Sequence, residues 1–123
     1  MTPYLKTEVD LYDELIVYSN TGSILYRGKP DGYPVKKAAA LENEQIVVLL
    51  KFWAKKPGDF ENLLLLKSDG GTLWRAQLPN ASSGDAYVDF DVIEGKLFAN
   101  SWSCYRVEID GQTGRILHRE FTK

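Results

Sequence analysis

The sequence predicts an all-β fold built from antiparallel meander units of about four strands. The stretch from Cys104 to Phe121 shows the pattern most clearly, because Val107 and Ile109 alternate with charged residues as in a half-buried strand. Residues 110–114, Asp-Gly-Gln-Thr-Gly, then supply a polar turn with two glycines free to take positive φ. An apolar strand resumes at Ile116, so this stretch is predicted to form strand, turn and strand.

Weaker copies of this motif occur twice upstream. Residues 113–119 align without a gap to residues 21–27, and residues 71–75 form a shorter version. The alignment makes Tyr26, Trp74 and His118 equivalent ring positions, spaced by a little under fifty residues. A second marker repeats in step, because the predicted strands 46–53 and 97–102 both end in tryptophan. A period of this length with strand-only content indicates propeller-type blades rather than helical repeats.

The segment from Val107 to His118 resembles the blade motif of quinoprotein-type (PQQ-like) β-propellers, in which an Asp, a Thr/Ser-Gly turn and a Trp follow one another. Asp110, Thr113 and Gly114 match that motif. His118 stands where the family has Trp, and Glu108 stands where it usually has Ala. The resemblance implies propeller-like sheets over most of the chain but carries no cofactor site across, and we expect no cofactor.

The first third of the chain contains three predicted strands and one ambiguous segment. Residues 6–11 alternate weakly, as in an edge strand, and residues 14–19 and 23–28 flank the turn Asn20-Thr21-Gly22. Proline and glycine are dense in residues 30–34, which marks a boundary between units. Residues 35–41 leave two alternatives open: their alanines and lysines favour a helix by propensity, whereas the repeat register requires a strand.

The remaining strands follow the same pattern of short apolar runs between turns. Residues 46–50 have no polar face and predict a central strand, followed by a loop at 54–61 with its tip at Pro57-Gly58. Strands at 62–67 and 72–78 flank a tight turn, and residues 79–85 form the second boundary loop. The strand 87–93 alternates, which places Tyr87, Asp89 and Asp91 on one face, and the strand 96–102 follows it.

These strands group into a partial unit (1–28) and two full units (35–78 and 87–121) of one domain spanning 1–123. Two and a half blades cannot close a ring, since propellers typically have four or more. We therefore expect an open or sandwich-like arrangement. Its unpaired edge strands would template association, so a protein partner or self-association as a homodimer is expected.

Composition excludes several classes of function. Apolar residues make up 44% of the chain, which is enough for a globular core. The net charge is −2, so the chain lacks the positive charge expected of a protein that binds nucleic acid or an anionic membrane. The single cysteine, Cys104, fits a reducing compartment, and the first ten residues lack the apolar core of a signal peptide. The longest apolar run is too short to span a bilayer. We expect a cytoplasmic, soluble protein.

Four carboxylates, Asp85, Asp89, Asp91 and Glu94, form the first candidate site. A solvated strand face is the favoured interpretation, ahead of a surface for a basic partner protein and of a hard-metal site. Oxygen ligands suit Mg²⁺ or Ca²⁺, but the spacing matches no calcium loop and no further ligands cluster nearby, so no metal is predicted.

The aromatic and nucleophilic residues give the second set of candidates. His118 is the only histidine, and no nucleophile with an orienting group accompanies it, so no catalytic residue is assigned. Cys104 is interpreted as inert, because no basic cluster lies beside it to depress its pKa. Trp74 is predicted to be core, whereas Trp53 and Trp102, next to polar loops, are candidates for binding a partner.

The function predicted from the sequence is a non-enzymatic protein-binding module, of immunity or adaptor type, that uses its acidic face or an open strand edge. Two alternatives stay open. One is a structural propeller fragment that assembles as a homo-oligomer. The other is a β-fold enzyme that uses Asp89 and Asp91 with His118, which requires these side chains to converge in one cleft.

Overall fold

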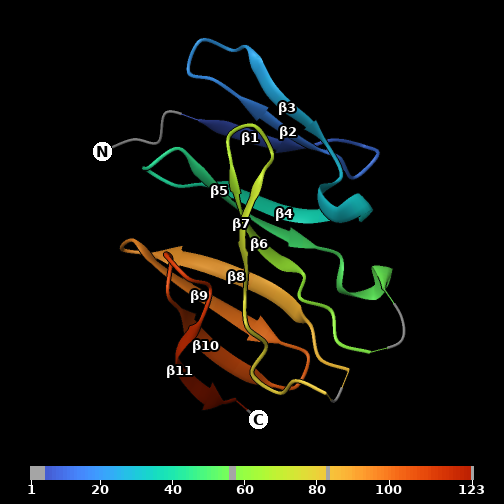
Figure 1. Ribbon diagram of the computed structural model, residues 1–123, viewed down its shortest axis with the longest axis vertical. Helices are drawn as coiled ribbons and strands as arrows, with labels where there is room; N and C mark the ends of the chain where they lie inside the picture. Colours follow the sequence, from blue (N-terminus) through green and yellow to red (C-terminus); the bar gives the residue numbers. More distant parts are fainter. Residues whose placement is uncertain (1–4, 56–57, 83, 123) are drawn as a thin grey trace.

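The computed structural model describes residues 5–55, 58–82 and 84–122, and over these residues the protein is all-β. Three antiparallel sheets follow one another along the long axis of the molecule, from β1–β3 at the top of Figure 1 to β8–β11 at the bottom. The strands are β1 (Lys6–Val9), β2 (Leu15–Tyr18), β3 (Ile24–Gly28), β4 (Val35–Ala40), β5 (Gln45–Leu50), β6 (Leu63–Lys67), β7 (Thr72–Arg75), β8 (Tyr87–Ile93), β9 (Lys96–Ser101), β10 (Tyr105–Ile109) and β11 (Ile116–Phe121). Short 3₁₀ turns occur at Pro30–Gly32 and Phe52–Ala54.

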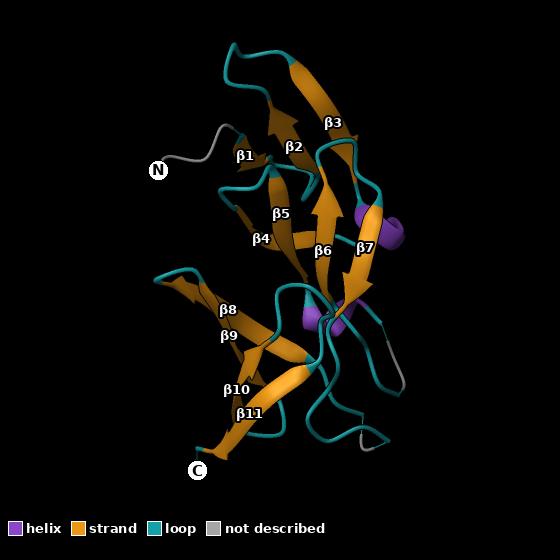
Figure 2. Cartoon of the chain, turned by 60° about the vertical axis from the view of Figure 1, so that its left-hand side comes forward, coloured by secondary structure: helices purple, strands orange, loops and turns teal. Residues whose placement is uncertain are grey.

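Each sheet is a simple meander in which consecutive strands pair. The first sheet has the order β1-β2-β3, the second β4-β5-β6-β7 and the third β8-β9-β10-β11 (Figure 2). Over the described residues, each sheet stays open. The predicted architecture of a partial unit and two full units in an open arrangement is therefore confirmed, and residues 35–40 form a strand, as the repeat register required.

The three sheets are repeats of one another, and a shared bulge establishes the register. In the outermost strand of each sheet, one ring residue forms the last regular backbone pair before a register shift: Tyr26, Trp74 or His118. The residue just before each ring, Leu25, Leu73 or Leu117, has no paired residue on the neighbouring strand. The equivalence predicted from the sequence thus holds at the level of individual backbone pairs.

The same register shows which strand of the other two sheets has no equivalent in the first sheet, as far as the structure describes the chain. Thr7 of β1 pairs with Val17, which pairs with Tyr26. In the second sheet Val47 of β5 pairs with Leu65, which pairs with Trp74. β1 is therefore the equivalent of β5, and within the described residues the first sheet has no counterpart of β4 or β8.

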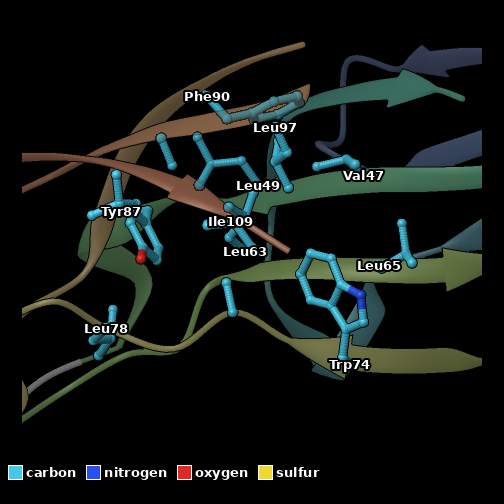
Figure 3. Close-up of a cluster of buried hydrophobic side chains, with 13 residues drawn as sticks. Val47, Leu49, Leu63, Leu65, Trp74, Leu78, Tyr87, Phe90, Leu97 and Ile109 are labelled. Carbon is cyan, nitrogen blue, oxygen red and sulfur yellow. The ribbon is translucent and has the colours of Figure 1, made fainter. Parts of the chain in front are cut away.

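The middle sheet is buried on both faces. One cluster packs its residues against the third sheet, where Leu49 and Leu63 meet Ile109 between Trp74 and Tyr87 (Figure 3). A second cluster packs its other face against the first sheet and includes Leu15, Val17, Val48 and Leu64. Strands β5 and β6 are apolar on both faces for this reason, because a strand with two buried faces has no polar side.

In the first and second sheets, a ring of the outermost strand rests on a glycine of the following sheet. The Trp74 ring lies against Gly114, where an added Cβ would be 2.8 Å from two ring carbons, and its Nε1 donates to the carbonyl of Gly111 over 2.9 Å. The Tyr26 ring lies against Gly70 in the same way. Both glycines have positive φ, so the turn requires glycine for its backbone and the neighbouring sheet requires it for space.

The two outermost faces of the stack are polar. In the middle sheet the row Ala39, Val47, Leu65 and Trp74 faces the third sheet. The equivalent row in the third sheet, on its outer face, is Asp91, Phe98, Glu108 and His118. On the outer face of the first sheet, Ile16 pairs with Glu8 on one side and Arg27 on the other. Neither outer face offers the apolar surface that joins the sheets inside.

Several predicted boundaries and one predicted face are wrong. β5, β7 and β9 end earlier than expected, at Leu50, Arg75 and Ser101, so Trp53 lies in a 3₁₀ turn and Trp102 in the turn after β9. Tyr87 does not share a face with Asp89, because a bulge between them turns the Tyr87 side chain inward, where it is fully buried. Of the loop tip expected at Pro57-Gly58, Pro57 lies outside the described residues, and Gly58 has a positive φ.

Among the described residues, the structure has no helix with the length and apolar character needed to cross a bilayer.

Candidate functional site

An exposed aromatic cluster lies where the second strands of two sheets end. Phe52 and Trp53 form the turn after β5, and Trp102 follows β9. The Phe52 ring centroid lies 4.8 Å from that of Trp53, edge to face, and 5.3 Å from that of Trp102. Trp53 is 50% exposed and Trp102 is 63% exposed. The two tryptophans predicted from the sequence are thus brought together around a third ring that was not predicted.

A hollow of about 280 Å³ opens beside these rings. Its walls are aromatic or small, with a lysine at the rim; the lining residues are Phe52, Trp53, Lys55, Gly58, Phe60, Gly84, Ala86 and Trp102. The Lys55 ammonium lies 5.8 Å from the Phe60 ring centroid and donates to the carbonyl of Asp59 over 3.1 Å. The Lys51 ammonium lies 5.6 Å from the Trp53 ring centroid and pairs with Asp13 at 2.7 Å. The hollow is therefore lined mainly by apolar groups, and Lys55 brings a positive charge to its lining, whereas the charge of Lys51 is paired with Asp13.

Two buried polar side chains connect the segments that carry the lining of this hollow. Asn62 is fully buried and joins the two sheets: its amide donates to the carbonyls of Leu50 and Tyr87, and its oxygen accepts from the Tyr87 N–H. Asp85 is 1% exposed and accepts hydrogen bonds from the N–H groups of Asn80, Ala86 and Ser103 and from the Ser103 hydroxyl. Because the polar groups of this network are satisfied, it restrains the backbone next to Phe52, Ala86 and Trp102.

The four predicted carboxylates do not form one patch. Asp85 is buried as described, and Glu94 lies in the turn after β8 with a positive φ. Asp89 and Asp91 share the outer face of β8, as predicted, but each is engaged by a cation. Lys37 contacts Asp89 at 3.0 Å, and Arg106 contacts Asp91 at 3.5 Å. The acidic surface expected from the sequence is therefore divided and largely neutralised.

The electrostatics of Asp89 follow from these contacts. Burial alone would raise the pKa of its carboxyl group, but hydrogen bonds from the Lys37 ammonium and the Phe90 N–H lower it, helped by the charges of Lys37 and Lys36. The net result is a pKa below the ordinary value. Asp89 is thus a charged structural anchor for Lys37.

The side chains of the enzymatic alternative predicted from the sequence do not converge. His118 is exposed and pairs across the sheet with Glu108, and Asp91 lies at the far end of the same row. Three strand spacings of about 4.8 Å separate them, or roughly 14 Å, beyond the reach of a hydrogen bond and a water. Among the described residues, no three histidine, cysteine or carboxylate side chains are placed to hold a metal ion.

A second, larger groove of about 860 Å³ lies between the middle and third sheets at the opposite end of the strands. It is open and lined by residues of turns and of the adjoining strands, including Leu41, Asn43, Gln45, Leu73 and Val92. Its lining is mostly uncharged and carries no exposed ring, so the aromatic hollow is the stronger candidate for recognition.

Comparison with known proteins supports the fold. The profile of a family described as a domain of unknown function, DUF7957, matches residues 32–121. A search of curated proteins gave no match. Among solved structures, the computationally designed Ika4 protein aligns over the whole chain and 70% of its own length, with a TM-score of 0.67 and 12% identity. The designed Ika8 protein aligns over the whole chain and 35% of its own length, with a TM-score of 0.66 and 12% identity.

Two natural β-propeller proteins also share the fold. Hsv2 from Kluyvelomyces marxianus aligns with 97% of the chain and 38% of its own length, with a TM-score of 0.56 and 14% identity. BamB from Moraxella catarrhalis aligns with 94% of the chain and 33% of its own length, with a TM-score of 0.53 and 14% identity. The chain spans about a third of the length of Ika8, Hsv2 and BamB. At this identity the similarity establishes propeller-like sheets and nothing about activity.

Proposed function

We propose that this chain, which belongs to the DUF7957 family of domains of unknown function, is a non-enzymatic module that binds a partner protein through the aromatic cluster Phe52, Trp53 and Trp102.

The observation that carries this proposal is the exposure of two tryptophans on a rigid base. A tryptophan that only filled a core would be covered, as Trp74 is at 8% exposure, yet Trp53 and Trp102 expose half or more of their surface. Exposed aromatic groups in fixed positions supply most of the binding free energy in many interfaces, because they bury a large area and lose little conformational entropy.

The chemistry of the hollow favours an acidic segment with an apolar anchor. An apolar side chain fits between Phe52, Phe60 and Ala86, and a carboxylate beside it would meet the Lys55 ammonium at the rim. Within the described part of the chain, the Lys55 ammonium contacts a backbone carbonyl and a ring. A carboxylate from a partner would therefore not have to displace an ion pair to Lys55.

The alternatives are weaker on geometric grounds. A basic partner on the acidic face would have to displace Lys37 from Asp89 and Arg106 from Asp91. Assembly of a ring by stacking would have to bury the polar row of Asp91, Glu108 and His118. An enzyme that uses Asp91 with His118 would need two groups that lie three strands apart.

We also infer that the blades are of the quinoprotein type. The turn of Asp110, Thr113 and Gly114 supports this, together with the Trp74 ring that rests on Gly114. Relatives with tryptophan at position 118 and a small apolar residue at position 108 would support the assignment, and relatives without the Asp/Thr-Gly turn would contradict it.

A selection from random peptides tests the binding site and defines the sequences that it prefers. A peptide library displayed on phage is selected against the immobilised full chain, and enriched sequences are synthesised and titrated. We expect acidic sequences with one apolar or aromatic anchor. Their affinity should fall by roughly 30-fold in Trp53→Ala and in Trp102→Ala, the size of an interface hot spot.

Two further variants sharpen the result. Leu117→Ala removes another exposed apolar side chain, 61% exposed on β11, and should leave the affinity unchanged. Lys55→Glu should shift the selection away from acidic sequences. The proposal fails if the enriched peptides bind the double variant Trp53→Ala/Trp102→Ala as well as the wild type.

A further inference from the structure

We propose that the turn after β1 is a second anchor point for the same partner, which is held as an extended segment with two apolar side chains about four positions apart. This inference rests on the proposed function. It extends the aromatic cluster to Leu11 and Tyr12, which belong to the first sheet.

The turns after β1 and β9 occupy the same place in their sheets. The pairing that makes β1 equivalent to β5 also makes it equivalent to β9, because Phe98 stands in the third sheet where Thr7 stands in the first. Counting the same number of residues forward makes Leu11 the equivalent of Trp102. The turns after β1, β5 and β9 all lie on the right-hand side of Figure 1, so each sheet contributes one turn to this side of the molecule.

The same hydrogen bonds close the turns after β1 and β9. In the first sheet, the Asp10 carbonyl accepts from the Asp13 N–H over 3.1 Å, and the Asp10 carboxylate accepts from the next N–H over 3.0 Å. In the third sheet, the Ser101 carbonyl accepts from the Cys104 N–H over 3.1 Å, and the Ser101 hydroxyl accepts from the next N–H over 3.1 Å. Asp13 and Cys104 both have positive φ, at 62° and 70°. The two turns therefore present their second residue in the same way.

That second residue is apolar and exposed in both turns. Leu11 is 98% exposed and its neighbour Tyr12 is 75% exposed, while Trp102 is 63% exposed. Neither turn needs an apolar residue there, because its hydrogen bonds use the backbone and the side chain of its first residue, and polar residues are the usual choice in turns. Adjacent apolar side chains held in solvent on a closed turn are available as anchors for a partner.

The first turn is attached directly to the aromatic cluster. The Asp13 carbonyl accepts from the Val35 N–H over 2.8 Å, and the Asp13 carboxylate contacts the Lys51 ammonium at 2.7 Å. That ammonium lies 5.6 Å from the Trp53 ring centroid. Leu11, two residues before Asp13 in the chain, is therefore part of a surface that continues through Lys51 to the cluster.

Charge gives the bound segment a direction. At the first turn, the carboxylates of Asp10 and Asp13 contact Arg27 at 3.7 Å and Lys51 at 2.7 Å. At the hollow, the Lys55 ammonium contacts a backbone carbonyl and a ring. An acidic residue of the partner is therefore favoured beside the hollow, and an uncharged apolar residue is favoured at the first turn.

The spacing of the two anchors follows from the geometry of the sheets. Packed sheets lie about 10 Å apart, and an extended chain advances about 3.4 Å per residue. The hollow lies between the second and third turns, about one and a half sheet spacings, or roughly 15 Å, from the first turn. About four residues cover that distance, and an even spacing points both side chains to the same side of an extended segment.

Random linear peptides displayed on phage are the probe, with a length of about twelve residues so that one extended peptide reaches both anchor points. They are selected in parallel against the full wild-type chain and the full chain with Leu11→Ser and Tyr12→Ser. Both side chains are exposed, so the double variant keeps the fold. We expect the wild type to select an acidic residue beside one apolar anchor and a second apolar residue about four positions away. The double variant should select only the first part.

Titration of the peptides selected on the wild type gives the size of the effect. Leu11→Ser/Tyr12→Ser should weaken their binding about tenfold, the value of burying one large apolar side chain. Replacing the second apolar residue of the peptide by serine should weaken binding equally on the wild type and have no further effect on the double variant. Ile24→Ser is the matched control, 54% exposed at the opposite end of the first sheet, and should leave the affinity unchanged.

Two outcomes separate this inference from the function on which it rests. Peptides that lose affinity in Trp53→Ala/Trp102→Ala but not in Leu11→Ser/Tyr12→Ser would overturn the second anchor and leave the proposed function in place. Peptides that tolerate both double variants, or a selection that enriches no binder, would overturn both.

Discussion

The same face of the repeated sheet carries different side chains in the middle and third sheets, although the strands pair in the same way. Between the middle and third sheets, the row Ala39, Val47, Leu65 and Trp74 is buried. One sheet further on, the equivalent row Asp91, Phe98, Glu108 and His118 is the end of the stack. The pairing pattern is the same, so the side chains alone decide whether another sheet can pack there.

Phe98, the single apolar residue of the terminal row, shows how apolar surface at the end of the stack is covered. The Arg106 guanidinium lies 5.2 Å from the Phe98 ring centroid, and it also contacts Asp91 and the Asn100 side chain. A guanidinium over a ring covers apolar surface while it stays hydrated. The terminal face thus needs no further sheet to cover it.

The largest expected effect comes from removing the ring at the inner interface. Trp74→Ala should lower the free energy of unfolding by about 3–5 kcal/mol, because it leaves a cavity and the carbonyl of Gly111 without its donor. His118→Ala, at the equivalent position on the terminal face, should change it by less than about 0.5 kcal/mol. Urea denaturation measures both, and equal effects would contradict the distinction between the two faces.

The polar link between the middle and third sheets should rank second. Asn62→Leu keeps the approximate volume of the side chain but leaves the Tyr87 N–H and two carbonyls unpaired in the interior. We expect a loss of about 2–4 kcal/mol, measured by thermal and urea unfolding. A loss within the error of the measurement would mean that water replaces the amide.

Two glycines at equivalent turn positions separate steric contact from backbone strain. Gly22 has a φ of 90° with nothing near an added Cβ, whereas Gly114 has a φ of 77° and the Trp74 ring 2.8 Å from that Cβ. Gly22→Ala should cost about 1 kcal/mol for its backbone alone. Gly114→Ala should cost roughly 1–3 kcal/mol more, because the ring must move. Equal losses of stability in the two variants would show that Trp74 does not pack against this turn in solution.

The smallest effect concerns the anchor of Lys37. Because the pKa of Asp89 is lower in the folded protein than its ordinary value near 3.9, its contribution to stability is complete above that value and is lost as pH falls through the folded pKa. Asp89→Asn should therefore reduce stability at pH 7 by less than about 1 kcal/mol and should flatten its acid dependence below pH 4. An unchanged acid limb would show that Asp89 carries no such linkage.

The repeat was predictable because it depends on patterns of residues that are close together in the sequence. The turn at residues 110–114 and the alternation of Val107 and Ile109 are short-range signals, and they fixed the register of His118 with Trp74 correctly. The bulge at Val88 was not predictable, because no glycine or turn residue marks it in the sequence, and the predicted face of Tyr87 was wrong for that reason. Asp85 looked like a surface carboxylate in a polar loop, but its N–H and hydroxyl partners come from residues up to 18 positions away.

The candidate site was predictable only in part. Trp53 and Trp102 were identified from their repeated spacing, yet Phe52 and Phe60 gave no signal, because their role depends on how two loops fold together.

Sedimentation equilibrium of the unmodified chain tests most directly whether this three-sheet stack ends at its own polar faces. We expect a single species with the monomer mass of 13.9 kDa from low to high micromolar concentration. A discrete dimer or larger ring, dispersed by Phe98→Glu on the terminal face, would contradict it.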